Sequence, residues 1–214
     1  MTLDIGRSFT YMFEDESWIM KIVVGGILLF IPIVNFMVLG YMVEALKRSA
    51  DSVDVPLPEW DDFGGKFMKG LMLLLIGVVY TIPIWLVGCV VAGLSLVAGD
   101  SETLGSLVAL LSACASCLYL VWGIVVWIIT PAAWIRYTVT GEFMSAFQFG
   151  ELFGFISANV ANYIVAIILY MVASFIAGFG TIACVVGVLF TMFWAGLVMA
   201  HVLGQVQRES LATA

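Results

Sequence analysis

Few side chains in this sequence combine the residue type and the spacing that chemistry requires. His201 is the only histidine, and Gln205 follows it at the i+4 position of a predicted helix, so the two share one face. A lone histidine needs partners to bind a metal or relay protons. We therefore interpret His201 and Gln205 as a hydrogen-bonded pair that locks this helix to a neighbour, with a pH-sensitive contact as the alternative.

Cys114 and Cys117 form a C-x-x-C motif inside an apolar stretch. Redox or metal chemistry needs the thiolate form, which a nearby cation must stabilise. No Lys, Arg or His is close in the sequence. We therefore interpret the two cysteines as small residues at a helix interface.

The long apolar stretches lack the residues that catalysis would need. They contain no Asp or Glu, and His201 is their only histidine. Aspartyl and zinc-dependent mechanisms within these stretches are therefore excluded. The glycine pairs Gly25-Gly26 and Gly64-Gly65 do not have the spacing of a phosphate-binding loop. We predict no catalytic residue, no metal ligand and no cofactor, and a protein that is not an enzyme.

Two short groups of polar or helix-breaking residues are candidate structural or ligand contacts. Pro32 and Asn35 interrupt an apolar stretch, where Asn35 is expected to cap a helix or to contact a ligand. Lys47 and Arg48 follow that stretch and are candidate contacts for a lipid phosphate. For Arg48 we favour an ion pair with Glu44 on the same helix surface over the lipid contact.

The composition places all these residues in a membrane protein. Of the 214 residues, 63% are apolar and 11% are charged, and the mean hydropathy is +1.14. Soluble domains have about 45–50% apolar and about 25% charged residues, so a soluble globular protein is excluded. The net charge of −7 argues against nucleic acid as a partner.

The acidic N-terminal stretch lacks the basic region of a signal peptide, so we expect it to be retained.

Runs without charged residues predict the membrane-spanning helices, since a span needs about 20 apolar residues. Four full spans are predicted, at residues 70–97, 104–130, 162–178 and 182–205.

The first apolar unit, residues 22–46, allows two interpretations. It forms either one spanning helix kinked at Pro32 or two half-length helices that re-enter on the same side. The re-entrant arrangement places all eight Lys and Arg on one side of the membrane, which the positive-inside rule favours, and we prefer it.

Three amphipathic stretches carry aromatic side chains on one face. They cover residues 1–20, 57–69 and 143–160, and such helices lie flat at the headgroup boundary.

The predicted fold is a single membrane domain over residues 1–214. It is an all-α polytopic integral membrane protein with four transmembrane helices, a re-entrant or kinked first unit, and interfacial helices on the cytoplasmic side. We expect a multi-pass protein of the cytoplasmic (inner) membrane with both termini in the cytoplasm.

Several motifs occur together along the chain. They are Phe13-Glu14-Asp15-Glu16-Ser17-Trp18, Ile31-Pro32-Ile33-Val34-Asn35, Gly40-Tyr41, Leu57-Pro58-Glu59-Trp60-Asp61-Asp62-Phe63 and Ala200-His201-Val202-Leu203-Gly204-Gln205. Over roughly residues 3–209 the chain resembles a prokaryotic membrane-protein family catalogued as a domain of unknown function (number four thousand and thirteen). More distantly, its plan is similar to the membrane domains attached to some glycerophosphodiester phosphodiesterases, without their catalytic barrel. The resemblance implies a multi-span cytoplasmic-membrane protein and supplies no catalytic residue.

Small residues recur at helical spacing, as in Gly196, Ala200 and Gly204, and also in Ala109, Ala113 and Cys117. Such ladders let helices approach closely in lipid. We therefore expect a non-enzymatic structural or accessory subunit, with membrane lipids and either a homo-oligomer or a larger membrane complex as partners. The alternative function is a binder or transporter of lipid or another small hydrophobic molecule.

Overall fold

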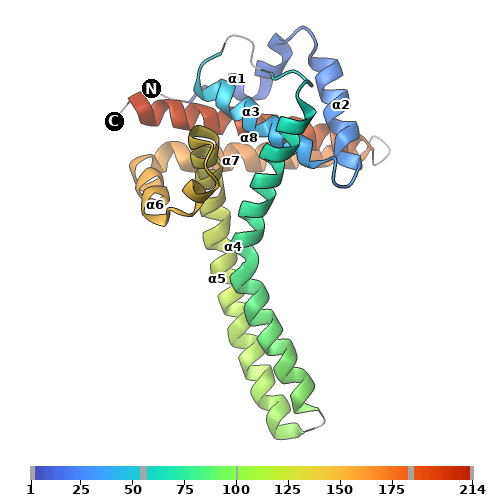
Figure 1. Cartoon of the computed structure of the whole chain (residues 1–214), viewed down its shortest axis with the longest axis vertical. Coiled ribbons are helices and arrows are strands. Elements are labelled where there is room, and N and C mark those ends of the chain that lie inside the picture. The colour runs from blue at the N-terminus through green and yellow to red at the C-terminus, as the bar shows by residue number, and fades with distance from the viewer. Residues whose placement is uncertain (1–2, 54–56, 100, 183–185, 213–214) are drawn as a thin grey trace. The chain divides into compact units, whose positions relative to one another are not determined.

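The computed structural model describes residues 3–53, 57–99, 101–182 and 186–212. Every regular element in these ranges is an α-helix or a short 3-10 helix (Figure 1). In chain order they are α1 (Ile5–Thr10), η1 (Tyr11–Glu14), α2 (Trp18–Phe30), α3 (Phe36–Ala50), α4 (Phe63–Ala98), α5 (Glu102–Thr140), η2 (Phe143–Phe147), α6 (Phe149–Ala158), α7 (Val160–Gly178), η3 (Phe179–Ile182) and α8 (Gly187–Ala212).

Within the described ranges four helical stretches are long and apolar enough to cross a membrane, as predicted. They are α4, α5, α7 continued by η3, and α8. The 39 residues of α5 extend about 58 Å at about 1.5 Å per residue, nearly twice the hydrocarbon thickness of about 30 Å. The protein is therefore a membrane protein whose longest helices exceed the length of one span.

The predicted start of α4 and the predicted end of α5 were wrong, because α4 begins before its charged residues and Pro131 does not end α5. Pro83 and Pro131 lie inside them. Beside Pro131, the Ala132 N–H donates to the Tyr163 hydroxyl at 3.0 Å, which satisfies the disturbed backbone. The helix therefore continues past residue 130, where the prediction ended it.

The first unit, residues 22–46, consists of two separate helices and not one kinked helix. The turn Ile31–Asn35 joins α2 and α3, which have 13 and 15 residues. At about 20 Å and about 22 Å, each is too short to span about 30 Å of hydrocarbon. Pro32 favours such a turn, and Ile33 reverses the chain with a φ of 71° in the left-handed region.

Two of the predicted interfacial stretches have different boundaries in the structure. Residues 143–160 do not form one helix, because breaks at Gln148 and Asn159 separate η2, α6 and α7. In residues 57–69, α4 already begins at Phe63, seven residues before the predicted span. The Asp62 carboxylate accepts the Gly65 N–H at 3.0 Å and caps this helix start.

Residues 1–20, the third such stretch, also do not form one helix. The described part contains α1, η1 and the first residues of α2. The Asp4 side chain accepts the Arg7 N–H at 2.9 Å and caps α1.

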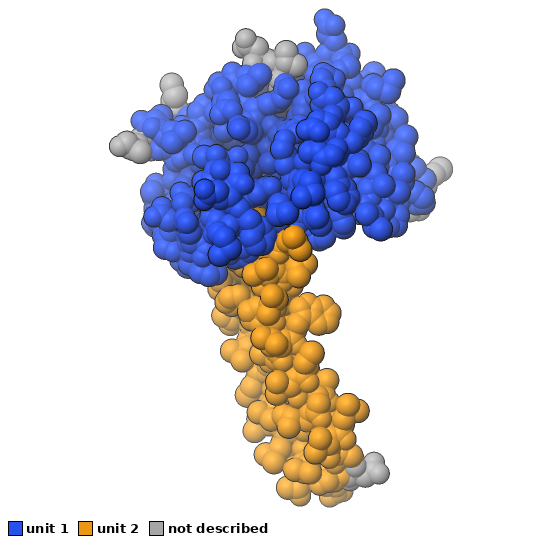
Figure 2. All heavy atoms as spheres, viewed as in Figure 1, with its two compact units in different colours: residues 1–74, 132–214 blue, residues 75–131 orange. Residues whose placement is uncertain are grey.

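The chain divides into two compact units, coloured separately in Figure 2. Unit 1 comprises residues 1–74 and 132–214, and unit 2 comprises residues 75–131. Within unit 1, α8 packs against α1, α2, α3 and α7. Unit 2 consists of the apolar halves of α4 and α5, which the Trp122 indole ties together by donating to the Tyr80 carbonyl at 2.8 Å.

Glycines set the distance between α3 and its neighbours in unit 1. A Cβ on Gly70 would overlap the Phe36 carbonyl, and one on Gly204 would lie 2.7 Å from the Leu46 carbonyl. The backbone of α3 therefore contacts α4 and α8 directly, which small residues in membrane helices permit. Gly204 belongs to the small-residue ladder predicted on α8.

Candidate functional site

A buried lysine joins three segments of unit 1. Lys21 on α2 is 3% exposed, and its Nζ lies 2.7 Å from Asp15 Oδ2 and 2.6 Å from Glu59 Oε1. The Trp60 indole donates to the Lys21 carbonyl at 3.0 Å. Burial raises the pKa of Asp15, but hydrogen bonds from Lys21 and Ser17 outweigh it and hold that pKa below its usual value.

A second buried lysine joins α3 and α4 in the same way. Lys66 is 1% exposed, and its Nζ lies 2.9 Å from Glu44 Oε2 and 3.0 Å from Asp61 Oδ1. The hydrogen bond from Lys66 lowers the pKa of Asp61. Lys69 also contacts Glu44, at 2.6 Å. These charged residues therefore connect helices.

The segment 57–63, one of the motifs that carry the family resemblance, has a structural role in unit 1. The Trp60 ring stacks on Tyr41 with centroids 4.3 Å apart, and the Tyr41 hydroxyl donates to the Pro58 carbonyl at 2.8 Å. Glu59 and Asp61 supply the carboxylates to the two buried lysines. The segment therefore holds α2, α3 and α4 together.

His201 and Gln205 lie on one face of α8 and contact different partners. His201 Nδ1 lies 2.9 Å from Ser49 Oγ of α3, and its ring stacks on Tyr11 of η1 with centroids 4.1 Å apart. The Gln205 carbonyl accepts the Asp4 N–H at 2.7 Å. Both side chains thus connect α8 to neighbouring segments of unit 1.

The remaining predicted contact residues do not converge on a single site. Asn35 occupies the N-cap position of α3, but its side chain makes no cap hydrogen bond, so the capping prediction was wrong. Pro32 is exposed in the turn before it. Lys47 is exposed, whereas Arg48 donates to the Leu57 carbonyl at 3.4 Å. Glu44, the expected partner of Arg48, pairs with the two lysines of α4.

The cysteine motif lies in unit 2. Cys114 and Cys117 are both exposed on α5. Their side chains are therefore not enclosed by the helices of unit 2.

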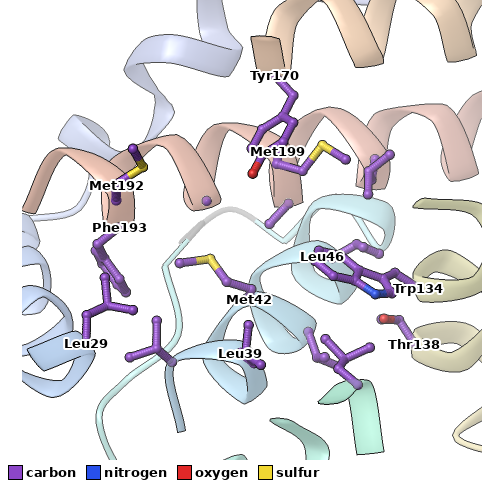
Figure 3. Close-up of a pocket in the computed structure, with 16 residues that line it drawn as sticks. Leu29, Leu39, Met42, Leu46, Trp134, Thr138, Tyr170, Met192, Phe193 and Met199 are labelled. Carbon is purple, nitrogen blue, oxygen red and sulfur yellow. The ribbon is translucent and has the colours of Figure 1, made fainter. Parts of the chain in front are cut away.

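The strongest candidate site in unit 1 is an apolar cavity of about 240 Å³ beside α8 (Figure 3). Six helices contribute its wall, so it forms only when unit 1 is folded. The lining residues are Leu29, Val38, Leu39, Met42, Val43, Leu46, Leu73, Trp134, Thr138, Tyr170, Met192, Phe193, Gly196, Met199, Ala200 and Leu203.

The wall of this cavity suits an uncharged apolar molecule. None of its lining residues is Lys, Arg, Asp, Glu or His. The side chains of Met42, Met192 and Met199 are flexible and polarizable, so they adapt to ligands of varied shape. Polar side-chain atoms come only from Trp134, Thr138 and Tyr170.

Sequence reasoning did not find this cavity or its polar residues. Pro32, Asn35, His201, Gln205, Lys47 and Arg48 are all absent from its wall. Trp134 and Thr138 lie on the part of α5 beyond residue 130, where the prediction had ended the helix. The available signal was the predicted small-residue ladder on α8, because two of its members, Gly196 and Ala200, line the cavity.

Residues 24–186 match the family described as "Protein of unknown function (DUF4013)", so the chain belongs to this family, as its motifs predicted. Neither a curated protein nor a solved structure matches the chain.

Proposed function

We propose that this DUF4013 protein is a non-enzymatic integral membrane protein that binds a lipid or another small hydrophobic molecule in the cavity of unit 1. The observation that carries this proposal is the apolar wall, which six helices build around about 240 Å³. An apolar cavity of about 150 Å³ is large enough to bind benzene, and ligand pockets begin at about 300 Å³. The volume therefore fits a small apolar molecule or part of a lipid chain.

The roles of the buried charged residues support binding over catalysis. Lys21 and Lys66 each hold carboxylates from other segments, and none of these groups lines the cavity. Within the described residues no group of His, Cys, Asp and Glu is arranged to hold a metal ion. The polar chemistry of unit 1 thus serves to position the helices around an apolar space.

The same proposal places the protein in the cytoplasmic (inner) membrane of a prokaryote, with both termini in the cytoplasm. The half-length helices α2 and α3 support a re-entrant unit. The exposed rings of Phe149 and Phe153 support an interfacial position for α6, since such rings favour the headgroup boundary. Membrane lipids are then both the solvent of the protein and the nearest source of ligand.

Native mass spectrometry of protein released from mild detergent tests the proposal. We expect the wild-type chain to retain an apolar molecule, and Leu39→Trp to lose it because the larger ring fills the cavity. Leu107→Trp is the matched control, since Leu107 is 53% exposed on α5 and faces no part of this cavity. Equal retention by all three proteins, or retention by none, would contradict the proposal.

A second candidate function is a structural or accessory subunit, and the exposed surface of unit 2 favours it. Only 11% of the most apolar window of α4 and 6% of that of α5 is buried, compared with 56% for α8. Ala109, Ala113 and Cys117 form an exposed ladder on α5, which suits close approach by another helix. The partner is a second copy of this chain or another membrane protein.

Purification in mild detergent followed by mass measurement tests this second candidate. An accessory subunit is expected to elute as a homo-oligomer or with a co-purifying membrane protein. A solitary monomer would count against it and would leave the binding proposal standing.

A further inference from the structure

Thr138 carries a buried hydroxyl that has no hydrogen-bond partner among the described residues. The residue is 6% exposed, and its Oγ1 is the unpartnered atom. Removing a hydroxyl from water without a replacement hydrogen bond costs free energy, so such groups in native structures call for a physical explanation.

Other hydroxyls on the apolar helices bond to backbone carbonyls. Thr130 donates to the Val126 carbonyl at 2.7 Å, and Ser112 donates to the Val108 carbonyl at 2.7 Å. Thr191 donates to the Ala177 carbonyl, also at 2.7 Å. Backbone bonding is the usual arrangement for Ser and Thr in such helices. Thr138 departs from this pattern at the wall of the cavity, and Figure 3 shows its hydroxyl turned toward the other wall residues.

The positions of the wall residues give the cavity two chemically different ends. In Figure 3 Thr138 is drawn beside Trp134, the Tyr170 hydroxyl lies between the two ends, and the apolar side chains of Leu29 and Phe193 lie at the opposite end. Along α8 the wall runs from Met192 to Leu203, which corresponds to about 16 Å. The shape therefore suits an elongated apolar chain with a polar group at one end.

We infer that the ligand is an uncharged alkyl or isoprenoid chain that ends in a hydroxyl or carbonyl oxygen, and that Thr138 Oγ1 is the specificity-determining contact for that oxygen. This inference rests on the proposed binding function. A threonine hydroxyl both donates and accepts, so it pairs with either oxygen type. A carboxylate or an ammonium group does not fit, because no opposite charge lines the cavity to offset its desolvation.

Binding of decanol, decane and decanoate to the full chain in lipid nanodiscs tests this inference. We expect the ratio of decanol affinity to decane affinity to be about tenfold higher in the wild type than in Thr138→Val, the preference that one hydrogen bond in an apolar site supplies. Thr138→Val should remove this preference without weakening decane binding, whereas Thr138→Ser should retain it. Thr130→Val is the matched control, since it alters a threonine on the same helix away from the cavity.

The outcomes separate the inference from the function it rests on. A decanol-to-decane affinity ratio that is the same in the wild type and in Thr138→Val would overturn the role of Thr138 and leave the cavity a binding site. If decanoate bound most tightly of the three probes, the inference that the ligand is uncharged would be overturned. No binding of any probe would overturn the proposed function itself. Partition into the nanodisc is the same for every variant, so comparing the variants cancels it.

Discussion

Lys21 and Lys66 are almost fully buried, and each bonds to two carboxylates from other segments. Buried ion pairs add little net stability relative to apolar side chains, because desolvation offsets their attraction. Removal of one partner is nevertheless costly, since the remaining charge stays buried. We interpret the two lysines as groups that determine which segments pack against α2, α3 and α4.

Lys21→Met is expected to destabilise the protein by about 3–5 kcal/mol, because it leaves Asp15 buried without its cation. The free energy of unfolding in detergent measures the effect. Arg7→Met is the control, since the Arg7–Glu14 pair is exposed and should be worth at most about 1 kcal/mol. A loss for Lys21→Met no larger than that of the control would contradict the structural role of this pair.

The pH dependence of stability should show the contribution of Asp15. Its pKa in the folded protein is lower than the value of about 3.9 in an unfolded chain. Its stabilising contribution is therefore complete above that value and is lost as the pH falls through the folded-state pKa. The difference in unfolding free energy between wild type and Asp15→Asn should be constant near neutral pH and shrink in acid. A difference in unfolding free energy that grows as the pH falls would contradict this prediction.

At the scale of the elements, α3 is held by direct backbone contact with α4 and α8. Gly70 faces the Phe36 carbonyl, and Gly204 faces the Leu46 carbonyl. Such contacts leave no room for a methyl group and fix the spacing of the helices that line the cavity. The shape of the cavity therefore depends on these glycines as well as on its wall residues.

Gly70→Ala should destabilise the protein by about 1–3 kcal/mol, because the new methyl group would force α3 and α4 apart. Gly77→Ala is the matched control on the same helix, since no atom lies within 4 Å of its Cβ position. That control should be neutral or stabilising by up to about 1 kcal/mol. Thermal unfolding compares the two variants, and equal stability would show that the helices do not touch at Gly70.

The sequence predicts the existence of the helices better than their ends. Charge-free runs indicate α4, α5, α7 and α8 because lipid-facing helices must be apolar over their whole surface. The ends were wrong at Pro131 and around Lys66, where hydrogen bonds and ion pairs to distant segments allow the helix to continue. The break between α2 and α3 was one of two predicted alternatives, since Pro32 marks its position.

The binding site was not predictable from the sequence for a related reason. Its wall combines residues from six helices, and no local pattern distinguishes Leu39 or Met199 from other apolar residues. Thr138 resembles any threonine in the sequence and is distinguished only by its missing partner. The residues predicted to be candidate contacts, such as His201 and Gln205, bond to neighbouring segments instead.

At the scale of the whole molecule, the proposed topology places both termini on one side of the membrane and the α4–α5 connection on the other. In a chain whose native cysteines are replaced by serine, a single cysteine replaces either Asp4 or Ser101. Its labelling shows on which side of the membrane that residue lies. A membrane-impermeant maleimide added to intact cells should label residue 101 and spare residue 4. Labelling of residue 4 from outside would contradict the re-entrant first unit.

The central claim is that unit 1 binds one apolar molecule in its cavity, and methionine methyl NMR in nanodiscs tests it most directly. Met42, Met192 and Met199 line the wall, whereas Met68 and Met144 are absent from it. On titration with decanol, the signals of the three wall methionines should shift together and saturate at one equivalent. Non-saturating shifts of similar size at all five methionines would contradict the claim, because they would show partition into lipid without a site.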